Sequence, residues 1–235
     1  MKRLLMVVTL ALVPLLGLVA NAAAVQSQPN DGVLDASQRV AGFTAGELLG
    51  EEWRQLLELP STSNPYTGTG DNCLKAGNKD KVLILWTTVA PVTPASCDVK
   101  PGTPVFFSTL NGECSSAEPP PYFGATEEEQ RQCILGLTED TTFDAILVSV
   151  DGGAPVNIGL DRFLAVSGQG SVYLADPNIL GVPGNENATF VAAAYSVMLR
   201  PLHPGTHTIK VKIVGGSFDG TINRAVINVV PGLNS

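Results

Sequence analysis

Residues 142–231 consist of short β-forming segments separated by turns that are rich in glycine, proline and polar residues. In segments such as TFDAILVSV (142–150) and TIKVKIV (208–214), apolar side chains recur at every second residue, which is the period of a strand with one buried face. Asp151-Gly152-Gly153 and residues 167–170 have the composition of hairpin turns. Strands at this spacing are typical of sandwiches. We therefore expect an all-β fold, an antiparallel β-sandwich similar to a jelly roll.

The first half of the chain adds two helices and two strands to this expectation. Thr44 and Glu47 form a capping box before an apolar helical stripe that ends at Pro60. Thr126 and Glu129 repeat the box at the start of a second helix, within 124–137. The apolar runs KVLILWTTV (81–89) and TPVFFSTL (103–110) predict strands, the first of them covered on both faces.

Two tryptophans fall inside these elements and are predicted to be core residues. Trp53 lies on the apolar stripe of the first helix, and Trp86 lies within the continuous apolar run. A sugar-stacking role for Trp86 is the alternative.

Four cysteines, an even number, predict two disulfides if the chain is exported to an oxidising compartment. Three pairings are open, and we expect the sequential one, Cys73 with Cys97 and Cys114 with Cys133. Each bond would close a loop of about 20 residues, worth about 3 kcal/mol in the chain-entropy model.

The amino-terminal residues have the pattern of a secretory signal. Lys2 and Arg3 precede an apolar stretch, and small residues that suit a signal peptidase follow at 20–24. We expect a signal peptide at 1–24, a flexible leader at 25–43 and a single disulfide-stapled β-sandwich domain at 44–235. A membrane anchor is the alternative, but Pro14 and Gly17 interrupt the apolar stretch. The protein is thus expected to be secreted, with no membrane span after cleavage.

Charge narrows the range of partners. Without Lys2 and Arg3, 22 acidic residues face 12 basic ones, a formal charge of −10. Such a surface repels phosphate backbones, so we expect no nucleic-acid partner.

Both histidines lie in PLHPGTHTIKVKI (201–213). Counting by two from Ile209 places His207 on the buried side of a strand, at its entrance. His203 lies beyond Pro204-Gly205, a turn that removes any regular register between the two rings. We predict that His207 is a structural, hydrogen-bonded residue; a ligand or a catalytic base is the alternative. Zinc would need further ligands from distant parts of the chain.

The segment LRPLHPGTHTIKV (199–211) resembles the "PL-x-PG-x-HTI" signature of a family of exported bacterial β-proteins with no established function. EEWRQLLELPSTSNPYTGTGDNC, CDVKPGTPVFFSTLNGEC and NILGVPG resemble further elements of that family, so the resemblance covers about residues 45–231. His207 matches the signature histidine. The chain departs from the pattern at Leu57, Lys100 and Ser196. The resemblance implies a fold and no activity.

The loop at 176–189 is the strongest ligand-binding candidate in the sequence. Its hard oxygen ligands on a flexible segment would suit calcium or a sugar; they are Asp176, Asn178, Glu186 and Asn187. An ordinary long connection is the alternative. Asn187-Ala188-Thr189 is also a glycosylation sequon, which matters only if the producing cell glycosylates.

No other pattern specifies chemistry. Serine-hydrolase motifs are absent from the sequence, and the aspartates at 140, 144, 151 and 161 select no pair of facing carboxylates. We assign no catalytic residue, no metal ligand and no cofactor apart from calcium at this loop. The sequence predicts a secreted, non-catalytic binding or structural protein, with a glycan or another cell-surface component as partner. A secreted hydrolase acting on glycans or other extracellular polymers is the alternative, and the oligomeric state stays open.

Overall fold

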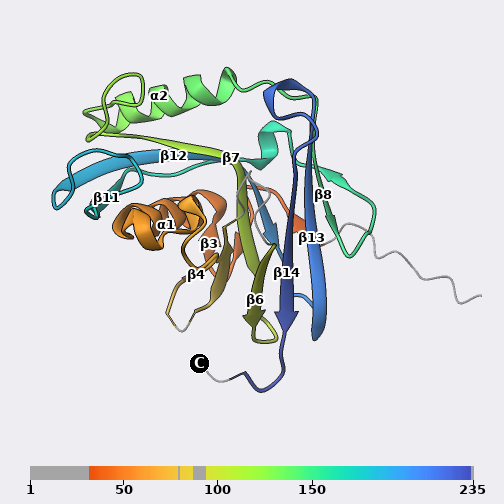
Figure 1. The fold of residues 1–235 in the computed structure, drawn as a ribbon. Helices are drawn as coiled ribbons and strands as arrows, with labels where there is room; N and C mark the ends of the chain where they lie inside the picture. The colour runs from red at the N-terminus through yellow and green to blue at the C-terminus, as the bar shows by residue number, and fades with distance from the viewer. Residues whose placement is uncertain (1–31, 79, 87–93, 234–235) are drawn as a thin grey trace, which may run out of the picture.

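The computed structural model describes residues 32–78, 80–86 and 94–233, and the long strands of these residues form two facing sheets (Figure 1). The first sheet has the order β1-β12-β7-β5-β4, and β10 and β11 also pair with β12. Its strands are β1 (Val33–Leu34), β4 (Cys73–Ala76), β5 (Val82–Leu85), β7 (Val105–Ser115), β10 (Leu164–Val166), β11 (Gly170–Tyr173) and β12 (Asn187–Leu199).

The second sheet has the order β6-β14-β13-β8-β9. Its strands are β6 (Ala95–Val99), β8 (Ala145–Val150), β9 (Val156–Asn157), β13 (Gly205–Val214) and β14 (Ile222–Val229). A separate hairpin joins β2 (Arg39–Val40) to β3 (Phe43–Thr44). Over the described residues the chain is therefore an all-β fold with two helices, as predicted, whereas the jelly-roll connectivity stays a prediction.

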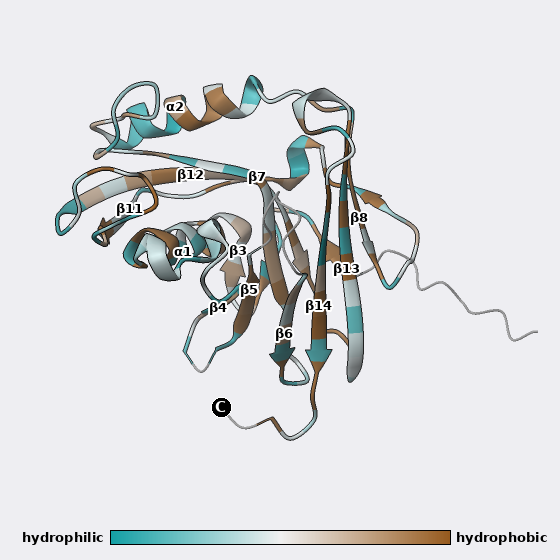
Figure 2. Cartoon of the chain, viewed as in Figure 1, coloured by the Kyte–Doolittle hydropathy of each residue, from teal (hydrophilic) through white to brown (hydrophobic). Residues whose placement is uncertain are grey.

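Apolar residues from both sheets fill the core of the sandwich. Phe107 and Val197 of the first sheet pack in one cluster with Ile209, Val211 and Ile227 of the second. Along β13 the buried residues alternate with Lys210 and Lys212, and Figure 2 shows this alternation of hydrophobic and hydrophilic residues. The period-two pattern of the sequence thus places one face of β13 in the core.

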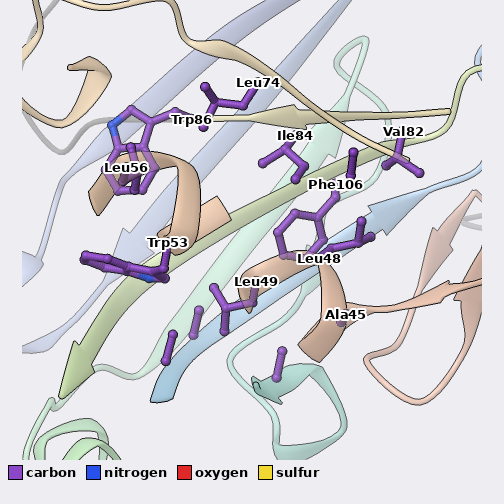
Figure 3. Packing of buried hydrophobic residues seen from close by; sticks show 14 of the residues in the cluster. Ala45, Leu48, Leu49, Trp53, Leu56, Leu74, Val82, Ile84, Trp86 and Phe106 are labelled. Carbon is purple, nitrogen blue, oxygen red and sulfur yellow. The ribbon is translucent and has the colours of Figure 1, made fainter. Parts of the chain in front are cut away.

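The opposite face of the first sheet carries a second core, formed with helix α1 (Ala45–Glu58). Leu48 and Leu49 of α1 pack against Ile84 and Phe106 of the sheet (Figure 3). The capping box of Thr44 and Glu47 begins this helix, as predicted.

Both tryptophans belong to this second core. Trp53 and Trp86 are each only 4% exposed, which confirms their predicted core positions. Their rings meet edge to face at 6.3 Å, and the half-exposed Tyr66 ring lies 5.8 Å from that of Trp86.

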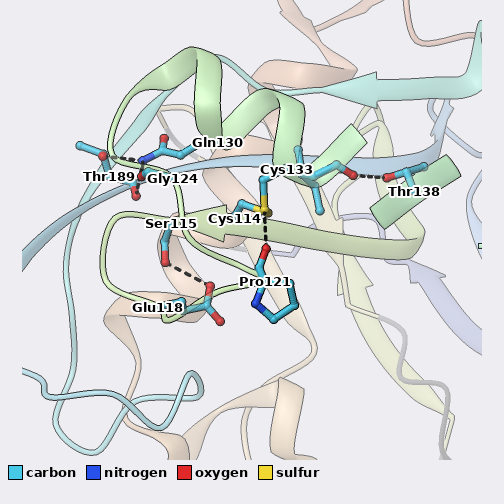
Figure 4. Close-up of a disulfide and its surroundings, with 10 residues drawn as sticks. Cys114, Ser115, Glu118, Pro121, Gly124, Gln130, Cys133, Thr138 and Thr189 are labelled. Carbon is cyan, nitrogen blue, oxygen red and sulfur yellow. Dashed lines mark hydrogen bonds between the residues drawn. A yellow bond between two sulfur atoms is a disulfide. The ribbon is translucent and has the colours of Figure 1, made fainter. Parts of the chain in front are cut away.

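The outer halves of β7 and β12 extend between α1 and helix α2 (Glu127–Glu139) (Figure 1). The disulfide between Cys114 and Cys133 joins β7 to α2 (Figure 4). The buried Gln130 amide of α2 donates to the Gly124 carbonyl oxygen (2.9 Å) and to Thr189 Oγ1 of β12 (2.8 Å). A covalent bond and buried hydrogen bonds therefore hold α2 on the sheet.

The second disulfide joins Cys73 at the start of β4 to Cys97 in β6. Both predicted pairings are thus confirmed. This bond connects the edge of one sheet to the other, whereas the Cys114–Cys133 bond lies outside the sandwich.

Three expectations from the sequence need correction. Within the expected leader at 25–43, residues 33–43 are not flexible, because β1 pairs with the end of β12, β2 pairs with β3, and Leu34 and Val40 are buried. The sandwich is not purely antiparallel, because β5 lies parallel to β7 and β6 lies parallel to β14. The predicted signal peptide at 1–24, residues 25–31 and residues 87–89 of the predicted strand lie outside the described residues.

The third correction concerns residues 167–170, which do not form a hairpin turn. β10 and β11 both pair with β12, one after the other along its length. At the interruption between them, the Ser167 amide donates to the Ala192 carbonyl, and the Ala192 amide donates to Ser167 Oγ, both at 2.9 Å. The serine side chain replaces a ladder hydrogen bond, so the chain continues forward where its composition indicated a reversal.

Candidate functional site

The loop at 176–189 uses Asn178, its only buried polar candidate, to hold its own shape. The Asn178 amide group donates to the carbonyl oxygens of Ala175 (3.0 Å) and Val182 (2.8 Å), and its Oδ1 accepts from the Leu180 amide (3.1 Å). Asn178 is 5% exposed. Its oxygen is therefore engaged with the backbone of the loop.

The other three candidates of this loop lie at the surface. Asp176 Oδ2 accepts from the Asn185 amide group at 3.2 Å, and Glu186 and Asn187 are exposed, Asn187 at the first position of β12. Over the described residues, no group of three or more His, Cys, Asp and Glu side chains could hold a metal ion. Calcium binding by this loop stays a prediction.

His207 lies at the entrance of β13 with both ring nitrogens hydrogen-bonded. Nδ1 is 2.7 Å from Asp151 Oδ2, and Nε2 is 2.8 Å from the His203 carbonyl oxygen. A carbonyl and a carboxylate only accept hydrogen bonds, so the doubly protonated ring satisfies both contacts. Burial disfavours the charge, but the bonds to Asp151 and to His203 outweigh it and raise the pKa of His207. The side chain of His203 is exposed, and His203 contacts the His207 ring through its backbone carbonyl.

Two buried carboxyl groups lie on the α1 side of the first sheet. Glu52 of α1 is fully buried, and Ser108 Oγ of β7 lies 2.7 Å from its Oε2. Burial raises the pKa of Glu52 to about 8, although the bond from Ser108 opposes the shift. Burial, followed by the nearby Glu118, raises the pKa of Glu113 to about 10. Burial therefore favours the protonated form of both groups. The sequence hinted at Glu52 only by placing it on the apolar stripe of the helix.

A pocket of about 740 Å³ opens where four loop regions meet beside the ends of the sheets. It is lined by Leu34, Gln38, Arg39, Val40, Ala41, Asp80, Lys81, Lys100, Pro101, Gly102, Thr103, Pro104, Arg200 and Pro201. These residues come from the β1–β3 region, the turn before β5, the β6–β7 turn and the segment after β12.

Local sequence shapes each of these regions. The β2–β3 turn passes through Ala41 and Gly42, both with positive φ (50° and 94°). The β6–β7 turn has Gly102 at φ 89° and closes with the Thr103 amide donating to the Lys100 carbonyl at 3.2 Å. The Arg200 amide donates to the Gly32 carbonyl at 3.0 Å, which ties the end of β12 to the start of the described chain.

The lining of the pocket is positively charged in an acidic protein. Arg39, Lys81, Lys100 and Arg200 face a single acidic lining residue, Asp80, whereas the whole chain has a net charge of −8. Asp80 forms an ion pair with Lys75 at 3.0 Å, and Arg39 forms one with Glu47 at 3.2 Å. Within the described ranges, no ion pair engages Lys81, Lys100 or Arg200. The pocket is thus suited to an anionic group.

Sequence reasoning missed this pocket because its cations are scattered. They lie at 39, 81, 100 and 200, in no motif, and only the sheet order brings them to one end of the fold.

A scan against protein-family models and a search of curated proteins found no match for this chain. The resemblance to exported β-proteins therefore stays a prediction. None of the described helices has the length and apolar character needed to cross a membrane.

Proposed function

We propose that this protein is a non-catalytic binding protein of the cell exterior and that its pocket binds an anionic glycan. The observation that carries the proposal is the gathering of four cationic side chains around one cavity in a chain of net charge −8. The two disulfides support an oxidising, extracellular compartment.

The dimensions and chemistry of the pocket support a sugar ligand that carries acidic groups. A volume of about 740 Å³ lies within the usual range for small-molecule sites. Leu34, Val40 and three prolines provide apolar contact for the carbon faces of a sugar ring. The arginines provide planar forks that match carboxylate and sulfate groups, and the lysines provide point charges.

Binding is a better account than hydrolysis for the groups that the structure shows. His207 has both nitrogens engaged and lies outside the pocket lining. Glu52 and Glu113 are buried, and burial raises the pKa of both, whereas a glycosidase needs one ionised carboxylate facing one acid. Asp80, the acidic residue of the lining, is paired with Lys75. We therefore rank a secreted hydrolase second.

The test is calorimetric titration of the purified protein with oligogalacturonides, which carry a carboxylate on each sugar, and with neutral oligosaccharides of equal length. We expect binding of the acidic glycan alone, and weaker binding at higher salt because the charges are exposed. The Lys100→Ala/Arg200→Ala double variant should bind about 4 to 25 times more weakly, since each exposed charged contact contributes about 0.4–1 kcal/mol and every 1.4 kcal/mol is a factor of ten.

The Lys210→Ala/Lys212→Ala double variant is the matched control. It removes the same charge from β13, outside the pocket, and should bind as the wild type does. Equal losses in the two double variants would show that net charge alone, and not the pocket, attracts the glycan. Binding of inorganic polyphosphate but of no acidic glycan would overturn the glycan assignment.

A further inference from the structure

One wall of the pocket is held by a carboxylate that belongs to a helix cap. Arg39 Nη1 donates to Glu47 Oε2 at 3.2 Å and to the Gly42 carbonyl oxygen at 2.6 Å. The same Glu47 Oε2 accepts from the Thr44 amide at 2.7 Å and lies 3.1 Å from Thr44 Oγ1. A single carboxylate oxygen therefore caps α1 and binds an arginine of the pocket lining.

The two roles of Glu47 differ in what they need. The cap needs an acceptor three residues after Thr44, and a glutamine provides one as well as a glutamate does. Neutralisation of Arg39 needs the negative charge. Both side chains are about half exposed, at 57% for Arg39 and 52% for Glu47, so Arg39 can exchange Glu47 for another anion without opening the core.

We propose that Glu47 is an internal counter-ion of the pocket, which competes with the bound anion for Arg39. This inference rests on the proposed function and adds a determinant of affinity that lies outside the pocket lining. An anion in the pocket takes the guanidinium contact that Glu47 makes in this structure, and part of the binding free energy is spent in breaking that contact. Glu47 thereby sets the affinity below the value that the four cations alone would give.

Asp80 is a weaker candidate for the same role. Its carboxylate is bonded to Lys75, which is not part of the lining, and it does not bind any of the four lining cations in the described part of the chain. Arg39 is the lining cation that is paired with a carboxylate, that of Glu47, so it is the residue for which Glu47 and the bound anion compete.

The test is the Glu47→Gln variant, titrated with the same oligogalacturonide. The variant keeps the cap and removes the competing charge, so it should bind the probe about two to five times more tightly than the wild type, the range expected for an exposed ion pair. In an Arg39→Gln background the same substitution should change affinity by less than about 1.5-fold, because the cation that Glu47 neutralises is gone.

Helix α2 provides the matched control. Glu129 occupies the same position in its capping box, with Oε2 accepting from the Thr126 amide at 3.1 Å, and it is not part of the lining. Glu129→Gln removes the same charge from the same kind of cap and should leave affinity unchanged. If Glu129→Gln tightens binding as much as Glu47→Gln does, net charge explains the effect and the proposal is wrong.

The failure of this inference is distinct from the failure of the proposed function. A wild-type protein that binds no acidic glycan overturns both. The counter-ion proposal alone is wrong if the wild type binds the acidic glycan but Glu47→Gln, with an unchanged melting temperature, binds it no more tightly.

Discussion

Replacing His207 with alanine should destabilise the protein in a way that depends on pH. The substitution removes a hydrogen bond to the Asp151 carboxylate and another to the His203 carbonyl, from a side chain that is only 15% exposed. A hydrogen bond to a charged partner contributes about 1.5–3 kcal/mol when buried, but Asp151 is 48% exposed, so we expect about 1 kcal/mol from it. The bond to the carbonyl adds about 1 kcal/mol. The total loss is therefore about 2 kcal/mol where His207 is charged.

The raised pKa of His207 sets the direction of the pH dependence. The folded protein holds the proton more tightly than the unfolded chain does, so the stabilisation is complete below the unfolded value of about 6.5. It is lost as the pH rises through the folded pKa, and one neutral hydrogen bond remains above it. His207→Ala should thus cost about 2 kcal/mol at pH 6 and about 1 kcal/mol at pH 9.

Urea denaturation of wild type and variant at the two pH values measures this difference. Asp151→Asn is the companion variant, because asparagine tolerates the positive φ of 52° and can still accept from the Thr208 amide. It should weaken or reverse the pH dependence, because only the bond to the His203 carbonyl then opposes the burial that lowers the pKa of His207. His203→Ala should cost less than about 0.5 kcal/mol, since only its backbone takes part. If His207→Ala loses the same stability at both pH values, or more at pH 9, then a charged His207 ring does not stabilise the fold.

Three further predictions concern the helices and the long loop. Gly46→Ala should destabilise the protein by about 1–3 kcal/mol in urea denaturation, because the new Cβ would lie 2.4 Å from the Val166 carbonyl oxygen. In Gly136→Ala the new Cβ meets no atom within 4 Å, so this variant should be more stable than the wild type by about 0.5–1 kcal/mol. Between the ordinary pKa of 4.5 and about 8, the folded wild type retains a proton on Glu52 that the unfolded chain releases, so its free energy of unfolding falls as the pH rises. Glu52→Gln lacks this proton, so its stability relative to the wild type should increase by about 1.4 kcal/mol per pH unit in that window. Plots of unfolding free energy against pH that run parallel for the two proteins would contradict a raised pKa of Glu52. If the 176–189 loop binds calcium, a calcium concentration of about 100 times the Kd should raise the melting temperature by a few degrees. An unchanged melting temperature at millimolar calcium would show that the loop is an ordinary connection between strands.

Local chemistry made much of the fold predictable. The capping boxes at Thr44 and Thr126 place both helix starts correctly, because a cap depends on residues within one turn. The alternation after His207 identifies the buried face of β13, because side chains of a strand alternate whatever its neighbours are. The disulfides follow from proximity in the chain.

Features that depend on distant segments were not predictable in the same way. Residues 167–170 have the composition of a turn, yet β12 offers a continuous edge on which the chain runs straight. Residues 33–34 appear unpatterned until β12 gives them a partner. The pocket needs four loop regions to converge, and no local pattern reports that. Glu52 looks like an interruption of an apolar stripe, and only the structure shows Ser108 as its partner.

The pairing of strands from opposite ends of the chain has a consequence for the order of folding. Val33 pairs with Leu199, and Val99 of β6 pairs with Val229 of β14, so neither sheet is complete until nearly the whole chain is available. The disulfides, in contrast, span only 24 and 19 residues and can close within short pieces of chain. These pairings close loops of about 170 and about 130 residues, which costs more entropy than closing loops of about 20. Topologies of this kind fold over milliseconds to seconds. The edges of β12 and β14 stay open during that interval, so the first and last strands determine how long the nascent protein is exposed to aggregation.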